Sequence, residues 1–261
     1  MLRPRIIPCL LVHDGGLVKT IGFKNPKYVG DPINAVKIFN EKEADELVVL
    51  DIDATVNGAE PDYEMIAHVA AESRMPLCYG GGVRTAAQAK RISLLGIEKV
   101  AISAAALENP SLISEMAAEI GRQSVVVILD VKKRSFGREA EVWTHNATRN
   151  TKRPWTEVAR EAEALGAGEI VLNSIDRDGE MQGYDLALAL QLRKTVGVPI
   201  TLLGGAGSLD DIRAVIDTCG VVGVAAGSLF VFKGTYKAVL INYPDAATKE
   251  SLFANLPRTT A

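Results

Sequence analysis

The sequence predicts an α/β protein of the TIM-barrel class, with residues 1–261 forming a single (β/α)8 barrel. Two observations lead to this prediction. Short apolar runs rich in β-branched residues alternate with longer amphipathic segments along the chain, which is the pattern of parallel strands joined by helices. The second half of the chain also repeats the first. This repeat favours two fused half-barrels over an open doubly wound sheet.

Eight runs have the length and composition of buried strands. Runs such as VVVILDV are apolar at nearly every position, which is typical of a parallel-sheet strand that is buried on both faces. The expected strands cover residues 5–12, 46–52, 76–79, 99–103, 124–131, 169–175, 199–203 and 221–226.

Amphipathic segments separate these strands. Several begin at a recognisable N-cap, such as Thr85 before AAQAKRISLL and Ser208 before LDDIRAVI. A hydroxyl at this position can accept a hydrogen bond from a free backbone N–H of the first helical turn. The expected helices cover residues 32–43, 63–73, 86–95, 111–120, 155–165, 186–196 and 209–218. Their strict alternation with eight strands favours a closed barrel.

The internal repeat is visible in two pairs of motifs. ELVVL recurs as EIVLN, and PLCYGGG recurs as PITLLGG. The two pairs are separated by the same distance along the chain, so Gly81 and Gly82 correspond to Gly204 and Gly205. The same order of motifs in both halves predicts two half-barrels related by a pseudo-twofold axis.

Composition and charge exclude several classes of function. The chain has 29 basic and 32 acidic residues, a net charge of −3, so no basic field is available to bind nucleic acid. Its apolar runs are too short for a membrane span or a signal peptide, and we expect no membrane partner. The three cysteines, Cys9, Cys78 and Cys219, lack the spacing of a disulfide framework or a zinc site. We therefore expect a cytoplasmic protein without metal or cofactor.

Glycine clusters follow the expected strands three, seven and eight. GGG at 80–82 and GGAG at 204–207 each precede a helix, and Gly227 and Ser228 follow the last strand. In a barrel these positions lie at the mouth formed by the carboxyl ends of the strands. Glycine lets backbone N–H groups approach an anion closely, and a helix N-terminus adds partial positive charge. The clusters predict two phosphate sites for an elongated phosphorylated ligand, with tight turns lacking any ligand as the alternative.

Motifs spread over nearly the whole chain resemble one known family. IIPCL, DGGLVKT, GDPINAV, DELVVLDI, ENPSLI, GGAGSLDD and the highly specific SIDRDG-x3-GYD resemble the cyclase subunit of imidazole glycerol phosphate synthase, the HisF type. The resemblance implies a barrel that receives ammonia from a HisH-type glutaminase subunit. It also implies that ammonia crosses the barrel and attacks a phosphorylated ribosyl-carboxamide, giving imidazole glycerol phosphate and an aminoimidazole nucleotide.

The resemblance implies an ammonia gate at the mouth where the strands begin. The family has a ring of ion-paired residues there, and this chain retains all four as Arg5, Glu46, Lys99 and Glu169. Mutual pairing of two cations and two anions would offset part of the cost of removing them from water. The alternative is a charged ring that only stabilises the end of the barrel.

The site implied at the opposite mouth is partly retained. The family works with paired aspartates at the ends of strands one and five; Asp130 is present, whereas Leu11 occupies the other position. Loss of a positioned acid–base group typically removes roughly 10²–10⁴ in rate. Substrate and phosphate contacts are implied for Lys19, Gly82, Ser103, Asn173, Asp178, Gly204, Gly205, Gly227 and Ser228. Four pocket positions depart from the family's pattern, namely Ser103, Ala104, Asn173 and Leu203.

An intact gate beside an altered pocket resembles a paralogous branch that works in surface-polysaccharide biosynthesis. PRIIPCLLVHDGGLVKT and AAGSLFVFKGTYKAVLINYP look like that branch. The resemblance implies that the barrel and its glutaminase feed ammonia to a third protein, an amidotransferase that makes an acetamidino group on a nucleotide sugar. Two functions stay open, a module that only conducts ammonia and an ammonia-dependent lyase and cyclase that uses Asp130. A related sugar-phosphate isomerase is disfavoured because it also needs a strand-one acid.

Two further features carry alternatives. His13 lies one pleat beyond Leu11 and either replaces the missing acid–base group or is an exposed loop residue. The basic insertion at 132–154 is either a solvated β-hairpin or a lid that contacts an anionic substrate. Within it, His145 is expected to be solvated.

Overall fold

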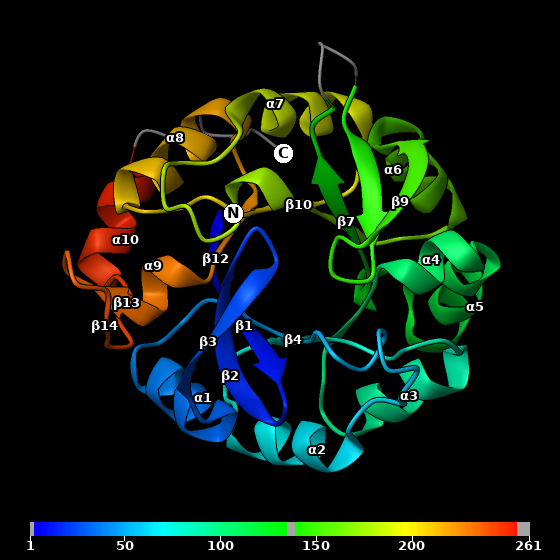
Figure 1. The fold of residues 1–261 in the computed structure, drawn as a ribbon, viewed down its shortest axis with the longest axis horizontal. Helices are drawn as coiled ribbons and strands as arrows, with labels where there is room; N and C mark the ends of the chain where they lie inside the picture. Colours follow the sequence, from blue (N-terminus) through cyan, green and yellow to red (C-terminus); the bar gives the residue numbers. More distant parts are fainter. Residues whose placement is uncertain (1–2, 135–138, 255–261) are drawn as a thin grey trace.

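The computed structural model describes residues 3–134 and 139–254. Eight parallel strands form a closed ring surrounded by helices (Figure 1), which confirms the predicted barrel. The barrel strands are β1 (Arg5–His13), β4 (Leu47–Asp51), β5 (Leu77–Gly80), β6 (Lys99–Ile102), β7 (Val125–Lys132), β10 (Glu169–Ser174), β11 (Ile200–Leu203) and β12 (Gly223–Ala226). Every boundary lies within two residues of the expected run.

The pairing of β10 with β7 closes the ring. Along β7 and β10, Asp130 lies in register with Asn173. At the equivalent place in the first half, Leu11 of β1 lies in register with Leu50 of β4. The two half-barrels therefore share one backbone register and differ in the side chains that they direct inward.

Helices cover the outer face of the ring. The expected helices are α1 (Pro32–Glu41), α2 (Tyr63–Glu72), α3 (Ala86–Leu94), α5 (Ser111–Ile120), α6 (Trp155–Leu165), α7 (Leu186–Thr195) and α8 (Leu209–Cys219). The structure adds α4 (Ala104–Glu108), α9 (Ser228–Val231), α10 (Ala246–Phe253) and the 3-10 turns η1 (Arg122–Ser124) and η2 (Ile175–Arg177). Thr85 and Ser208 form the predicted caps of α3 and α8, each as a capping box. Within the described ranges, none of the helices has the length and hydropathy of a membrane span.

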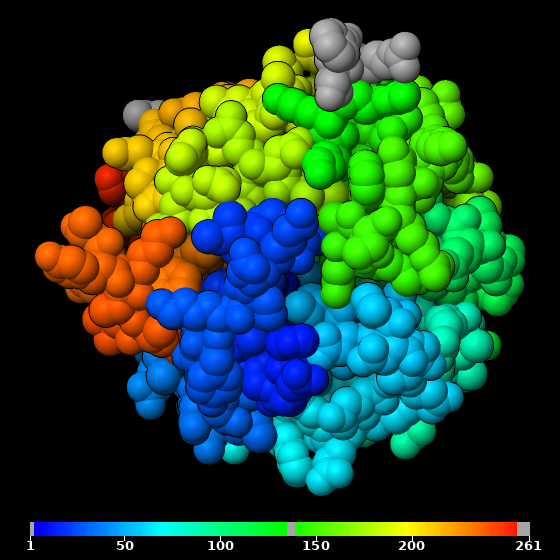
Figure 2. All heavy atoms as spheres, in the orientation of Figure 1, coloured from blue at the N-terminus to red at the C-terminus, as the bar shows by residue number. Residues whose placement is uncertain are grey.

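Antiparallel hairpins extend two of the barrel strands. They are β2 (Gly16–Ile21) with β3 (Lys24–Gly30) after β1, and β8 (Glu141–Thr144) with β9 (Arg149–Pro154) after β7. Both hairpins lie over the same mouth of the barrel (Figure 2). The second hairpin occupies the basic insertion, of which residues 135–138 lie outside the described chain. A short pair, β13 (Phe232–Lys233) with β14 (Ala238–Val239), follows α9.

The half-barrel repeat extends to hydrogen bonds at the start of each hairpin. The backbone N–H of Asp14 donates to Oδ2 of Asp53 at 2.8 Å, and the N–H of Lys133 donates to Oδ2 of Asp176 at 2.8 Å. These aspartates occupy equivalent positions in the two halves. Equivalent carboxylates in the two halves therefore fix the chain where it leaves strand one and strand five.

Two apolar cores lie on the two sides of the barrel wall. The larger one packs the outward side chains of the strands against the helices. The smaller one fills the lumen with Ile7, Cys9, Val48, Cys78, Ala101, Val126, Ile128, Val171 and Ala225. The lumen is thus apolar between the two mouths of the barrel.

Tyr243 fixes the C-terminal segment to the mouth where the strands begin. Its hydroxyl donates to the carbonyl oxygen of Ile6 at 2.8 Å and accepts from the backbone N–H of Asp45 at 3.1 Å. Its ring packs against Phe39 and Phe230. The hydroxyl thereby joins residues next to the starts of two barrel strands.

We predict that Tyr243→Phe lowers the free energy of unfolding by about 1–3 kcal/mol, because two half-buried backbone groups lose their partner. Urea unfolding monitored by circular dichroism measures this change. Tyr236→Phe is the matched control, since the Tyr236 side chain is 98% exposed, and it should leave stability unchanged. An equal loss in both variants would contradict the prediction.

Candidate functional site

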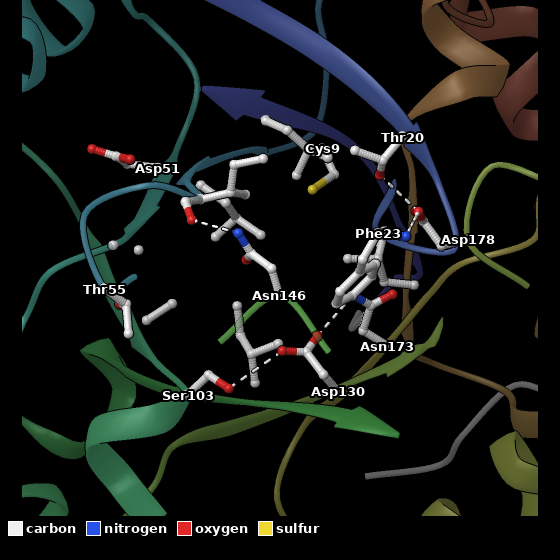
Figure 3. Close-up of a pocket in the computed structure, with 18 of the residues that line it drawn as sticks. Cys9, Thr20, Phe23, Asp51, Thr55, Ser103, Asp130, Asn146, Asn173 and Asp178 are labelled. Carbon is white, nitrogen blue, oxygen red and sulfur yellow. Dashed lines mark hydrogen bonds between the residues drawn. The ribbon is translucent and has the colours of Figure 1, made fainter. Parts of the chain in front are cut away.

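A cavity of about 350 Å³ opens at the mouth formed by the carboxyl ends of the barrel strands. The loops after these strands form its wall, and the upper lumen forms its floor (Figure 3). The ten residues for which the sequence predicts catalysis or ligand contact all line it, namely Asp130, Lys19, Gly82, Ser103, Asn173, Asp178, Gly204, Gly205, Gly227 and Ser228. The structure therefore brings them together, and their contact with a ligand stays a prediction.

Asp130 lies at the end of β7, on the polar side of the cavity floor. Its Oδ1 accepts a hydrogen bond from Asn173 Nδ2 at 2.9 Å, and its Oδ2 accepts a longer one from Ser103 Oγ at 3.4 Å. Burial raises the pKa of Asp130 to about 7, although both hydrogen bonds act to lower it. A carboxyl group with this pKa can hold or release a proton at neutral pH.

The floor is apolar on the side of the first half-barrel. Leu11 and Leu50 line the cavity there, and Leu203 lines it as well. Leu11 and Leu50 occupy the register positions that Asp130 and Asn173 occupy in the second half. The side chain of Leu11 has no exchangeable proton, so it cannot act as an acid or a base at the end of β1.

Asn173 presents an unpaired acceptor at this floor. Its Nδ2 donates to Asp130, while its Oδ1 is buried and finds no hydrogen-bond partner within residues 3–134 and 139–254. A buried polar atom without a partner costs about 1–3 kcal/mol. A ligand N–H or O–H group would remove this cost.

Lys19 brings a buried amino group to the same cavity. Its Nζ donates to the carbonyl oxygen of Cys9 at 2.5 Å, and burial lowers its pKa. A Cβ on Gly227 would lie 2.6 Å from this Nζ, so glycine lets the ammonium lie against the junction of β12 and α9. In the described part of the chain, no carboxylate forms an ion pair with Lys19. An anionic ligand group at this junction would supply the missing charge.

Asp178 fixes the β2–β3 hairpin over the cavity. Its Oδ2 accepts hydrogen bonds from the Thr20 hydroxyl at 2.7 Å and from the Phe23 N–H at 3.1 Å (Figure 3). Burial raises the pKa of Asp178. This arrangement gives Asp178 a structural task beside the predicted contact with substrate.

The β8–β9 hairpin contributes wall residues that the sequence did not indicate. Asn146 Nδ2 donates to the carbonyl oxygen of Ile52 at 2.9 Å, which joins the hairpin turn to the loop after β4 (Figure 3). His145 and Arg149 line the cavity beside it. The prediction of a solvated His145 was wrong, because its side chain is only 12% exposed. The insertion is a hairpin that also forms part of the cavity wall.

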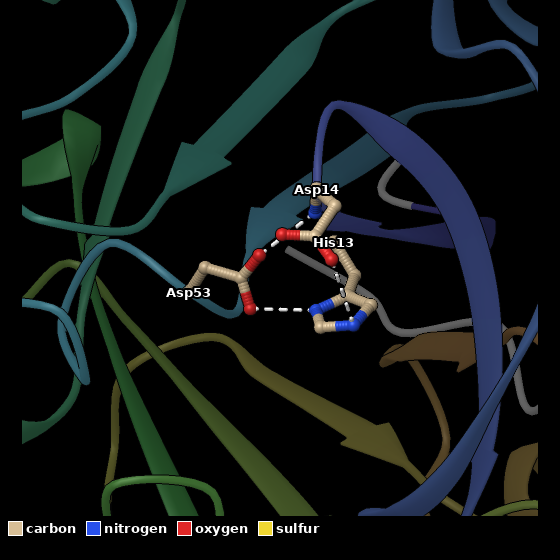
Figure 4. Close-up of side chains that lie close together, drawn as sticks. All are labelled: His13, Asp14 and Asp53. Carbon is tan, nitrogen blue, oxygen red and sulfur yellow. Dashed lines mark hydrogen bonds and ion pairs between the residues drawn. The ribbon is translucent and has the colours of Figure 1, made fainter.

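His13 lies beside the mouth, outside the set of residues that line the cavity. Its Nδ1 lies 2.7 Å from Asp53 Oδ1, and its Nε2 lies 3.5 Å from Asp14 Oδ2 (Figure 4). The hydrogen bond with Asp53 raises the pKa of His13. Ligand atoms of these three side chains lie within 4.8 Å of one another, close enough for a cation. The expectation of a protein without metal stays a prediction.

The four predicted gate residues meet inside the opposite mouth. Arg5 pairs with both Glu46 and Glu169, the latter at 2.7 Å. Lys99 pairs with the same two carboxylates, each at 2.8 Å. Burial alone would raise the pKa of Glu169, but Arg5 and Lys99 overcome this effect and bring it to about 2. The result is a closed ring of alternating charges that we call the charged ring.

Comparison with known proteins identifies the family of this chain. Residues 5–237 match the family profile described as histidine biosynthesis protein. A Leptospira borgpetersenii protein, provisionally named imidazole glycerol phosphate synthase subunit HisF, is 56% identical over 253 residues, which cover 97% of this chain and 100% of the relative. A Pseudomonas aeruginosa protein, provisionally named subunit hisF2, is 54% identical over 94% of this chain and 97% of its own length. Imidazole glycerol phosphate synthase subunit HisF of Streptococcus sanguinis is 41% identical over 88% and 91%, respectively. The chain therefore belongs to the HisF type of the histidine biosynthesis protein family.

Proposed function

We propose that this barrel conducts ammonia from a HisH-type glutaminase subunit through the charged ring and the lumen to the opposite mouth. It there serves a third protein, an amidotransferase that forms an acetamidino group on a nucleotide sugar in O-antigen or related polysaccharide biosynthesis. The observation that carries the proposal is the contrast between a complete charged ring and a cavity floor with Leu11 in place of an acid.

The lumen supports passage of a small neutral molecule. Between the charged ring and the cavity, its lining is formed by aliphatic side chains and the thiols Cys9 and Cys78. Removing an ion from water into such surroundings costs several kcal/mol, whereas a neutral molecule avoids this cost. The lumen therefore favours ammonia over the ammonium ion.

The relatives support a specialised branch of the family. Proteins of Vibrio vulnificus and Pseudomonas aeruginosa at 57% and 54% identity bear the provisional names hisF3 and hisF2. The HisF subunits of Streptococcus sanguinis and Lactococcus lactis are 41% and 43% identical. The chain is more similar to the proteins named hisF2 and hisF3 than to these HisF subunits, which supports a role different from that of the ordinary synthase.

A cyclase of histidine biosynthesis is the second candidate function. In that case ammonia would attack the ribosyl-carboxamide substrate in the cavity, which would yield imidazole glycerol phosphate and aminoimidazole carboxamide ribotide. Asp130, with its pKa near 7, and the buried amino group of Lys19 favour this candidate. Leu11 opposes it, because the partner carboxylate is absent.

We predict that the purified barrel, given ammonium salt and the ribosyl-carboxamide substrate, leaves substrate absorbance unchanged. Leu11→Asp should create measurable turnover, because a carboxylate then faces Asp130 across a cavity that retains Lys19 and both glycine clusters, although four other positions depart from the family's pattern. Leu11→Asn is the matched control, since it is polar but cannot exchange a proton. Turnover by the wild type that Asp130→Asn reduces by roughly 10²–10⁴ would instead establish the cyclase.

We predict that Lys99→Ala uncouples glutamine hydrolysis from amidation in the reconstituted reaction of glutaminase, barrel and acceptor protein. Removing the Lys99 cation leaves the negative charges of Glu46 and Glu169 only partly compensated. The charged ring then no longer closes this mouth, and ammonia can escape from it. The ratio of product to glutamate measures the coupling. Lys90→Ala removes an exposed ion pair with Glu119 and should leave the ratio unchanged. Unaltered coupling in Lys99→Ala would show that the charged ring is only structural.

We predict that Asp130→Asn stabilises the barrel at pH 8 and leaves its stability nearly unchanged at pH 4. The unfolded carboxyl releases its proton near the ordinary pKa of 3.8, whereas the folded one keeps it until about pH 7. The wild type therefore loses stability as pH rises through this window, by at most about 4 kcal/mol for three pKa units. Urea unfolding at both pH values measures the difference. Asp210→Asn, on the surface of α8, should show no such dependence on pH.

A further inference from the structure

A threonine on β11 contacts the charged ring from inside the barrel. Thr201 is 1% exposed, and its hydroxyl donates a hydrogen bond to Oε1 of Glu169. The neighbouring residue in register on β12 is Gly223. A Cβ on Gly223 would lie 1.9 Å from the Thr201 hydroxyl oxygen, so only glycine leaves room for the hydroxyl at this place.

This contact makes the two anions of the charged ring unequal. Glu169 accepts hydrogen bonds from Arg5, Lys99 and Thr201. Glu46 accepts from Arg5 and Lys99, and its side chain has no third donor among the described residues. A side chain tied to the barrel wall by a neutral donor keeps its place when a cation moves. Glu46 has no such tie.

We propose that Thr201 is a positioning residue of the charged ring, which holds Glu169 in place so that the ring opens on the side of Glu46. The moving group is then the side chain of Glu46, the residue directly before β4, together with a cation that it binds. The inference refines the proposed function by locating the ammonia entrance. The additional hydrogen bond on Glu169 nevertheless lies within the barrel and does not depend on a partner protein.

An opening on this side leads to a native thiol. Cys78 of β5 lies in register with Val48 of β4 and lines the lumen. Among the charges that act on the Cys78 thiol, Glu46 has the largest effect after burial, and it raises the thiol pKa. On the other side, Val171 lies two residues beyond Glu169 on β10 and also lines the lumen. Cys78 and a cysteine at position 171 would report the two sides separately.

The test measures how fast methyl methanethiosulfonate, a small neutral thiol reagent, modifies these two sites in the purified Val171→Cys barrel. Peptide mass spectrometry follows both thiols in one sample. Adding Thr201→Val removes the hydroxyl while keeping the shape of the side chain. We expect the rate at position 171 to rise three- to tenfold, because Glu169 is released, while the rate at Cys78 changes less than twofold. Thr201→Ser should keep the original rates, since it retains the hydroxyl.

Gly223→Ala provides a second route to the same result, because the added methyl displaces the Thr201 hydroxyl. An equal rise at both thiols would show a general loosening of the barrel and would overturn the proposal, as would unchanged rates at both. The measurement needs neither glutaminase nor ammonia. A failure here therefore leaves the conduction of ammonia standing, and a failure of coupling leaves the role of Thr201 standing.

Discussion

Neutralisation of four charged side chains inside one mouth of the barrel is the interaction on which the lumen depends. Glu46 and Glu169 are 3% and 4% exposed, and each is bound by both cations. Removing one partner of such a group leaves a buried charge uncompensated, at a cost of about 3–5 kcal/mol. Strands β1, β4, β6 and β10 must therefore keep one common alignment. Above the charged ring, the side chains that cluster in the lumen are apolar.

The two half-barrels have the same contacts in the scaffold but different contacts at the cavity. Asp53 and Asp176 hold equivalent backbone groups with the same geometry, because each hairpin needs a fixed starting point. On the cavity floor, the pair of Asp130 and Asn173 is hydrogen-bonded, and the equivalent leucines form an apolar surface. The first half of the floor is apolar, whereas the second half is hydrogen-bonded but leaves Oδ1 of Asn173 without a partner among the described residues. Replacing the polar pair by the leucine pair, or the reverse, therefore leaves the backbone register of the barrel unchanged.

The sequence predicted the barrel and its strands from apolar alternation, and it predicted the glycine clusters of the cavity from their position after strand ends. The other members of both mouths were expected only from the resemblance to the HisF type. It did not predict the wall formed by His145 and Asn146, which depends on three successive residues with positive φ in the β8–β9 turn. The insertion was expected to form either a hairpin or a lid, but its composition does not show which turn residues reach the cavity. The contact of Thr201 with Glu169 was also missed, because it joins two strands and requires the space left by Gly223. Side-chain contacts of this kind depend on strand stagger, which periodicity does not define.

Three groups at the cavity lack internal compensation. Burial raises the pKa of Asp130 to about 7. The buried Oδ1 of Asn173 has no hydrogen-bond partner, and Lys19 has no carboxylate partner, within the described residues. Each arrangement lowers stability, and apolar side chains would remove the cost. A barrel that only conducted ammonia would gain from that exchange. These three groups support the predicted contact of the cavity with an anionic ligand that carries a hydrogen-bond donor, and that contact stays a prediction.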